Sequence, residues 1–242
     1  DTSTLTSGTF TVAATGIAKT TGGQNTLGGT VTNAASGEIQ IGNNTSLRLQ
    51  ATGLFTNSGT ISLNSAGNST DLIMMGGDVT LSGAGTLSLS NFSTNRIYGV
   101  ATSDRLINAA GHTIQGSGQL GLGLMGFTNH GTVIANQSNA LVIAPSSSGA
   151  TNTGTLRATN GATLNVTGGT FTNTGGTNEA LTGSTVRFDS ADVAGGTLSS
   201  TGTGRLLNAA NSSFSNLSLA TGATFDVANA TWTNTIGAPE LI

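Results

Sequence analysis

The sequence predicts an all-β fold: one single-stranded, right-handed parallel β-helix, or β-solenoid, with about 10–11 coils of 20–25 residues. Three observations support this prediction. A short motif recurs along the chain at the coil period, apolar and polar residues alternate over short segments, and turn-forming residues bound those segments. No segment has the i, i+3, i+4, i+7 apolar spacing of an amphipathic helix.

The recurring motif reads Phe-Thr-Asn-x-Gly-Thr in its fullest form. Its full and partial copies begin at Val31, Phe55, Phe127, Ala150, Phe171 and Trp232. Steps between the motif asparagines are about 20–25 residues or small multiples of that length. Two longer segments also recur, 161–166 as 222–227 and 105–110 as 205–210. A repeat of this length indicates one supersecondary unit per copy, stacked on its neighbours.

The local pattern predicts short strands. Apolar and polar residues alternate at 46–50, 85–90 and 163–167, and Gly, Asn and Ser supply the positive-φ positions of the turns between such segments. Antiparallel sandwiches do not repeat their sequence at this period, leucine-rich repeats need a longer leucine consensus, and propeller repeats are about twice as long. Parallel crossovers are right-handed by default. Stacking at the strand spacing gives a rod about 50 Å long.

Composition limits the classes of partner. Only 7% of the residues are charged, the net charge is −3, and Lys19 is the single lysine, so the basic field that attracts nucleic acids or anionic membranes is absent. The chain has no cysteine for disulfides or thiolate metal sites, and no apolar run reaches the length of a membrane span. We expect one β-solenoid domain over residues 1–242, a fragment or subunit of a larger surface structure, without nucleic-acid partner or direct membrane insertion.

The motif residues predict two internal features. Side-chain amides on stacked coils can form a hydrogen-bonded ladder, but Asn also tolerates left-handed turn conformations, so a simple turn role remains an equal alternative. We expect these asparagines at one corner of the solenoid: Asn57, Asn129, Asn152 and Asn173. The motif aromatics are predicted to stack inside the solenoid or against one corner: Phe55, Phe127 and Phe171.

Two segments carry a family resemblance. Residues 83–90, Gly-Ala-Gly-Thr-Leu-Ser-Leu-Ser, resemble the glycine-rich repeats of bacterial autotransporter passengers. Residues 112–121, with the Phe-Thr-Asn-x-Gly-Thr units, are similar to stretches of large adhesins of the autotransporter and haemagglutinin-like class. The resemblance covers most of the chain and implies a right-handed β-helix, export through the envelope and a cell-surface or extracellular location. The secretion and membrane domains of that family are not recognisable, which favours a fragment or a free fibre subunit.

Carboxylates provide the only enzymatic candidates. β-Helix enzymes that cleave acidic polysaccharides need clustered carboxylates on one face. Asp189 and Asp192, with Arg187 compensating their charge, are the strongest candidate, but a solvated turn is the favoured interpretation. Asp71 and Asp78 form a weaker candidate that is expected on a surface loop. We therefore predict no catalytic residues and no enzymatic activity.

The remaining motifs predict no cofactor and no metal. His112 and His130 fall at turn-like positions, and His130 takes the variable position of the motif, so neither is predicted to be catalytic. No zinc-protease helix motif, P-loop or calcium-binding nonapeptide appears. The Gly-x-Gly string at 121–124 lacks the following helix and downstream acid of a dinucleotide site.

Threonine pairs raise the alternative of ice binding, which requires a flat threonine array on successive coils. The pairs skip many coils, and threonine is also a good strand former on a solvated face. The pairs are Thr9/Thr11, Thr170/Thr172 and Thr231/Thr233.

The leading functional prediction is an extracellular structural or adhesive β-helix module of a bacterial surface protein or fibre, whose polar faces contact surfaces or glycans. The alternatives are a polysaccharide-cleaving β-helix enzyme and an ice-binding solenoid. Because both ends of the chain are strand-like and lack helical or charged caps, we also expect head-to-tail self-association.

Overall fold

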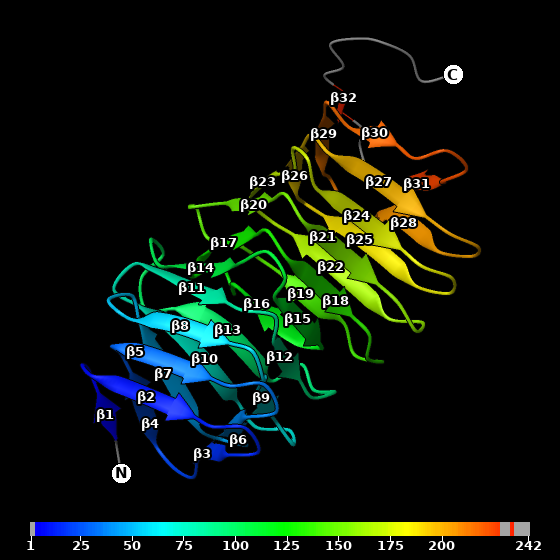
Figure 1. The fold of residues 1–242 in the computed structure, drawn as a ribbon. Helices are drawn as coiled ribbons and strands as arrows, with labels where there is room; N and C mark the ends of the chain where they lie inside the picture. The colour runs from blue at the N-terminus through cyan, green and yellow to red at the C-terminus, as the bar shows by residue number, and fades with distance from the viewer. Residues whose placement is uncertain (1–2, 228–232, 235–242) are drawn as a thin grey trace.

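The structure is a computed structural model that describes residues 3–227 and 233–234. These residues form a parallel β-solenoid of about 10 coils, with roughly 22 residues per coil and three parallel sheets. Figure 1 shows the coils stacked along one axis, from β1 at the blue end to β30 at the orange end. The β-solenoid prediction is confirmed, whereas its right-handed winding stays a prediction.

Each coil contributes one strand to each sheet, so the first coil contains β1–β3 and the fifth β13–β15. Sheet A contains β1 (Thr4–Leu5), β4 (Gln24–Leu27), β7 (Ser46–Gln50), β10 (Thr70–Met75), β13 (Asn95–Gly99), β16 (Gly118–Leu120), β19 (Leu141–Ile143), β22 (Thr163–Thr167), β25 (Thr185–Asp189), β28 (Arg205–Asn208) and β31 (Phe225–Val227). Sheet B contains β2 (Thr9–Val12), β5 (Thr30–Asn33), β8 (Leu54–Asn57), β11 (Asp78–Ser82), β14 (Arg105–Asn108), β17 (Gly126–Asn129), β20 (Ala150–Asn152), β23 (Thr170–Thr172), β26 (Asp192–Ala194), β29 (Ser213–Ser215) and β32 (Thr233–Asn234). Sheet C contains β3 (Ile17–Thr20), β6 (Glu38–Gly42), β9 (Thr60–Asn64), β12 (Thr86–Leu89), β15 (Thr113–Gly116), β18 (Thr132–Ala135), β21 (Thr155–Ala158), β24 (Thr177–Ala180), β27 (Thr197–Ser200) and β30 (Ser218–Leu219).

The core lies inside the coils. In β22, Leu164 and Val166 are buried while the alternate residues of the strand are partly exposed, as period-two patterning requires. The motif aromatics Phe55, Phe127 and Phe171 are also buried, at 2–5% exposure. Their predicted stacking is wrong, because Ala150 lies in register between Phe127 and Phe171. The small Ala150 side chain therefore separates the two large rings in the core.

The two longer recurring segments differ in whether their copies occupy equivalent positions in the solenoid. Segments 161–166 and 222–227 contribute β22 and β31, which occupy the same sheet and are three coils apart in strand order. Segments 105–110 and 205–210 contribute β14 on sheet B and β28 on sheet A, so they are not equivalent parts of the repeat. Strands of different sheets share the same alternation of inward and outward residues, as in β14 and β28. The same short segment can therefore form a strand in more than one sheet.

The asparagine ladder is confirmed at the corner between sheets B and C. Asn108 Nδ2 donates to Asn129 Oδ1 at 2.7 Å, and Asn129 Nδ2 donates to Asn152 Oδ1 at 2.7 Å. Asn152 Nδ2 then donates to Asn173 Oδ1 at 2.6 Å. These four side chains are buried, so each amide satisfies a group that water does not reach.

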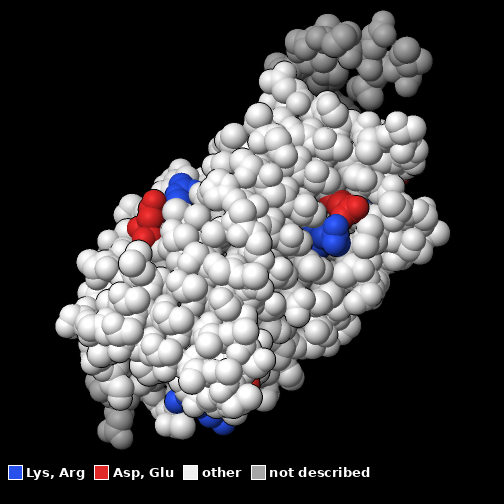
Figure 2. All heavy atoms as spheres, viewed as in Figure 1, with Lys and Arg blue, Asp and Glu red and all other residues white. Residues whose placement is uncertain are grey.

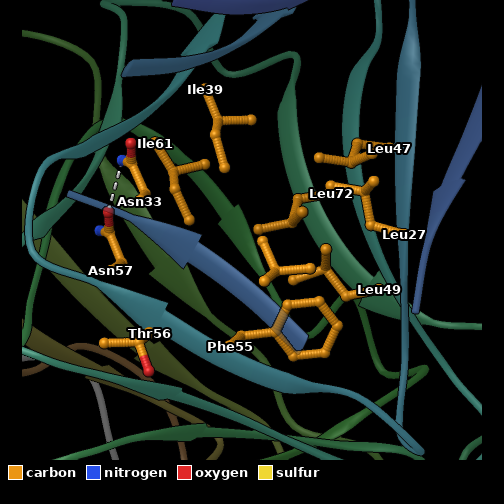
Figure 3. Close-up of a pocket in the computed structure, with 11 residues that line it drawn as sticks. Leu27, Asn33, Ile39, Leu47, Leu49, Phe55, Thr56, Asn57, Ile61 and Leu72 are labelled. Carbon is orange, nitrogen blue, oxygen red and sulfur yellow. Dashed lines mark hydrogen bonds between the residues drawn. The ribbon is translucent and has the colours of Figure 1, made fainter. Parts of the chain in front are cut away.

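An earlier stretch of the same ladder is separated from this one by coil 4. Asn33 Nδ2 donates to Asn57 Oδ1 at 2.8 Å (Figure 3). The strand register changes in coil 4, where Leu81 aligns with Phe55 of the previous coil but with Asn108 of the next. Coil 4 therefore has no asparagine at the ladder position.

Candidate functional site

The two aspartates of the strongest carboxylate candidate flank a turn between two strands. Asp189 ends β25 on sheet A and accepts a hydrogen bond from Arg187 Nη2 at 2.9 Å. Asp192 begins β26 on sheet B, beyond a turn at Ser190 with φ of 57°. Ser213 Oγ donates to Asp192. The two carboxylates lie on different sheets and do not form a pair on one face.

The structure corrects the placement of Asp71 and Asp78 on a surface loop. Asp71 is the second residue of β10 and is 8% exposed, and Asp78 is the first residue of β11. Arg96 donates to Asp71 from Nε and Nη2, both at 2.7 Å, and the Tyr98 hydroxyl donates to it at 3.2 Å. The loop expectation is wrong because the partner that permits burial of Asp71 lies 25 residues away, one coil later.

These side chains belong to a polar cluster on the outer face of sheet A. The Arg96 guanidinium lies 5.6 Å from the centroid of the Tyr98 ring. The hydrogen bond to Asp71 raises the pKa of Arg96, while burial and then the Asp71 carboxylate raise the pKa of Tyr98. Ile73 lies in register between Arg48 and Tyr98 and is only 2% exposed on this outer face. The cluster therefore covers an outward apolar residue with long amphipathic side chains.

The histidines lie in turn segments, as predicted, but in different environments. His130 is exposed, and its Nδ1 lies 2.7 Å from the Thr153 hydroxyl. His112 lies between β14 and β15 and is 0% exposed. Its Nδ1 is 2.7 Å from Asn108 Oδ1, and its Nε2 is 3.0 Å from Asn57 Nδ2. Burial lowers the pKa of His112 to about 4, so the ring is neutral at neutral pH.

The predicted threonine pairs do not form a long array. Thr9 and Thr11 align with Thr30 and Thr32 of the next coil. In the coil after that, Leu54 takes the position that aligns with Thr30. The coil after Thr170 and Thr172 has aspartate and alanine at the aligned positions. Residue 231 lies outside the described residues.

Sequence reasoning missed a longer threonine column on sheet C. Seven consecutive coils begin their sheet C strand with a threonine, all in register: Thr60, Thr86, Thr113, Thr132, Thr155, Thr177 and Thr197. A local signal was present, because six of the seven follow a glycine and the other follows His112. We call this set the sheet C threonine column.

The hydroxyl groups of this column are available to a ligand. All seven residues are partly exposed, and their hydroxyls hydrogen-bond to no other residue of the described ranges. The next outward position on the same strands carries Ser62, Ser88, Gln115, Ile134, Arg157, Glu179 and Ser199. The two charges in that series cancel, because Arg157 Nε and Glu179 Oε2 lie 2.6 Å apart.

Charge is sparse on the molecular surface. Figure 2 shows a face covered almost entirely by uncharged residues, with a few basic and acidic groups beside one another. Ion pairs also form on sheet A, as between Arg205 and Asp226 at 3.0 Å. Such a surface presents hydroxyl and amide groups rather than a field of one sign.

A hollow in the core of the described residues is too small for a ligand larger than water. A gap of about 10 Å³ in the N-terminal core is lined by Leu49, Phe55 and Leu72 among others (Figure 3), and has room for about one water molecule. Within the same part of the chain, no three His, Cys, Asp or Glu residues gather as metal ligands, and no helix could cross a bilayer. The 121–124 string forms a corner that leads into β17 rather than a helix.

Comparisons with protein-family models, curated proteins and solved structures found no match to this chain.

Proposed function

We propose that this chain is an extracellular structural and adhesive module of a bacterial surface protein or fibre, related to the autotransporter and haemagglutinin-like adhesins that its repeats resemble. The observation that carries the proposal is the sheet C threonine column, seven outward hydroxyls in successive coils that have no hydrogen-bond partner among the described residues. A rod of about 10 coils holds these groups in one line.

The column suits an extended neutral polysaccharide that lies along the solenoid axis. Its hydroxyls follow one another at the strand spacing of about 4.8 Å, and a sugar ring in an extended β-linked chain advances by a similar distance. Each threonine hydroxyl can donate and accept a hydrogen bond. Many weak contacts on one rigid line add through effective concentration, so no single deep pocket is needed.

The test compares two threonine sets in the same three coils. Thr132, Thr155 and Thr177 lie in the sheet C threonine column, and the control set on sheet B is Thr128, Thr151 and Thr172. Valine removes the hydroxyl and keeps the strand-forming β-branch. We expect the sheet C triple variant to lose at least about tenfold in binding to insoluble cellulose or chitin, since each net hydrogen bond contributes about 1 kcal/mol.

The sheet B triple variant should bind as the wild type does. Equal retention of both variants on the polysaccharide, or absence of wild-type binding to both polymers and to intact bacterial surfaces, would contradict the adhesive proposal. Circular dichroism of each variant controls for folding.

Head-to-tail assembly is the second part of the proposal. Strands β1, β2 and β3 pair with a neighbour on one side only within the described residues. Unpaired strand edges template the addition of further strands, so a second copy can continue the three sheets. We expect a mass that rises with protein concentration in light scattering. A strictly monomeric mass over a wide concentration range would contradict assembly without affecting the polysaccharide test.

The two rival functions have less support. No two described carboxylates occupy in-register positions on neighbouring strands of one sheet, as Asp71 illustrates by facing Ser46 and Arg96. Ice binding calls for adjacent threonine columns, but the sheet C threonine column lies beside mixed residues such as Ile134 and Arg157. We therefore propose neither activity.

A further inference from the structure

The position of His112 is occupied by glycine in most other coils. The residue just before each sheet C strand accepts a backbone hydrogen bond from the next coil, as Gly85 O does from Thr113 N and His112 O from Thr132 N. Glycine holds this position at Gly16, Gly37, Gly59, Gly85, Gly131, Gly154, Gly176 and Gly196. His112 is therefore a departure from the repeat, and not one of its regular turn residues.

The His112 ring fills the gap that coil 4 leaves in the asparagine ladder. It lies in coil 5, contacts Asn108 of its own coil at 2.7 Å, and reaches past coil 4 to Asn57 of coil 3 at 3.0 Å. Without the ring, the amides of coils 3 and 5 would have no connection at this corner. His112 thus joins the Asn33–Asn57 stretch to the stretch that begins at Asn108.

In the hydrogen bonds between ladder asparagines, each amide donates to the asparagine of the next coil. This direction determines which nitrogen of the His112 ring carries the proton. Asn57 Nδ2 also donates to Thr86 O at 3.1 Å, which holds that amide with its donor toward the ring. Nε2 of His112 must then accept, and Nδ1 carries the proton and donates to Asn108 Oδ1. A second proton on Nε2 would set one donor against another and leave the ladder broken between coils 3 and 5.

We propose that His112 is an acid-sensitive joint, whose protonation opens the solenoid locally at coil 4 while the rest of the rod remains folded. The charge that forms would be buried without a counter-ion. In coils 3 to 6 the strands that meet at this corner are β8, β9, β11, β12, β14, β15, β17 and β18. Their charged residues are Asp78 and Arg105, and each begins its strand at the end away from this corner. His130 follows β17 in an exposed turn and binds Thr153. None of these groups supplies a compensating charge.

The pH window follows from the sign of the shift. The pKa of His112 falls from 6.5 in an unfolded chain to about 4 when folded. The unfolded or opened form therefore binds more protons between these values, so the stabilisation is complete above pH 6.5 and is lost as the pH falls toward 4. The opening equilibrium should shift by a factor on the order of a hundred across this window.

Hydrogen exchange of the full chain tests the joint. The amides of Thr86 and Thr113 bond across coils 3–5, whereas those of Thr155 and Thr177 bond across the regular ladder. As the pH falls from 7 to 4, the protection factors of Thr86 and Thr113 should fall by roughly a hundredfold relative to Thr155 and Thr177.

His112→Gln is the variant that mimics the neutral ring, because its side-chain amide can both donate and accept a hydrogen bond but does not titrate. We expect it to abolish the difference in pH dependence between the two amide pairs, and the control His130→Gln to retain it. Protection that falls equally at all four amides, or a difference that survives in His112→Gln, would overturn the proposal. If His112→Gln does not fold, two measurements on the wild type test the proposal instead: the comparison of the amide pairs and the ¹⁵N chemical shifts of His112, which report its tautomer. A charged His112 ring at pH 6 would also overturn the proposal.

Discussion

Two stretches of one corner ladder differ in how they connect their coils. From Asn108 to Asn173, each coil passes one amide hydrogen bond to the next at 2.6–2.7 Å. Between Asn57 and Asn108 the same corner lacks an asparagine, and the His112 ring spans the distance of two coils. The fold continues through both stretches, so the backbone sheets do not require an unbroken ladder.

The comparison shows that asparagine and glycine are coupled between neighbouring coils. A Cβ added at Gly176 would lie 2.4 Å from Asn152 Nδ2, and one added at Gly196 would lie 2.2 Å from Asn173 Nδ2. For five of the six ladder asparagines, a Cβ on the glycine of the next coil would lie within 2.9 Å of the amide nitrogen, whereas at Gly154 the nearest atoms belong to the backbone of His130 and Gly131. The two turns with larger residues at this position, His112 and Leu217, follow coils without a ladder asparagine.

The largest expected effect concerns the core, where the two stretches should not differ. Phe55 lies in coil 3, just before the break in the ladder, and Phe127 lies in the continuous part between Asn108 and Asn173. Both side chains are buried. Phe→Ala at either position should cost about 3–5 kcal/mol, because it removes an aromatic ring and leaves a cavity. Chemical denaturation measures both. A loss under about 1 kcal/mol at one position would show that the stretches differ in packing and not only in their ladders.

The next effect isolates the ladder itself. Asn152→Leu leaves Asn173 Oδ1 without its donor and removes one of the three acceptors of Asn129 Nδ2. It should cost about 2–3 kcal/mol, since a buried unsatisfied group costs about 1–3 kcal/mol and a lost hydrogen bond about 1 kcal/mol. The matched control is Asn208→Leu. Asn208 is equally buried, but its amide has no hydrogen-bond partner among the described residues. That control should be neutral or stabilising. Equal losses in the two variants would mean that the ladder hydrogen bonds contribute nothing.

Much of this architecture could be predicted from the sequence, because a stacked repeat repeats its local chemistry. The motif placed Asn129, Asn152 and Asn173 at one corner, and period-two alternation identified the buried residues of strands such as β22. The likeness of segments 105–110 and 205–210 suggested equivalent positions in the repeat. It was misleading because a strand that ends in Asn and is followed by two alanines fits two different corners.

The contacts between coils are what the sequence could not provide. The partners of Asp71 and His112 lie a coil or more away, at separations of 25 residues for Arg96 and 55 for Asn57. Their meeting depends on register, and coil 4 changes the register by placing Leu81 against both Phe55 and Asn108. The sheet C threonine column could have been found, since its Gly-Thr dipeptides recur at the coil period.

The smallest expected effect tests the coupling between asparagine and glycine. Gly176 has no positive φ, so its need for glycine comes from space alone: an added Cβ would meet Asn152 Nδ2 at 2.4 Å and Asn152 O at 2.5 Å. A backbone oxygen cannot turn away as a side chain can. Gly176→Ala should therefore cost about 1–3 kcal/mol through overpacking.

Gly22→Ala is the matched control for that substitution. Gly22 also lacks a positive φ, and its added Cβ would meet nothing within 4 Å. Alanine there restricts the unfolded chain and should be neutral or stabilising by up to about 1 kcal/mol. Thermal or urea denaturation of the two variants gives the difference directly. If Gly176→Ala were as stable as Gly22→Ala, the corner would have room for a side chain above an asparagine. The presence of His112 and Leu217 only in coils that follow a coil without a ladder asparagine would then need a cause other than steric exclusion.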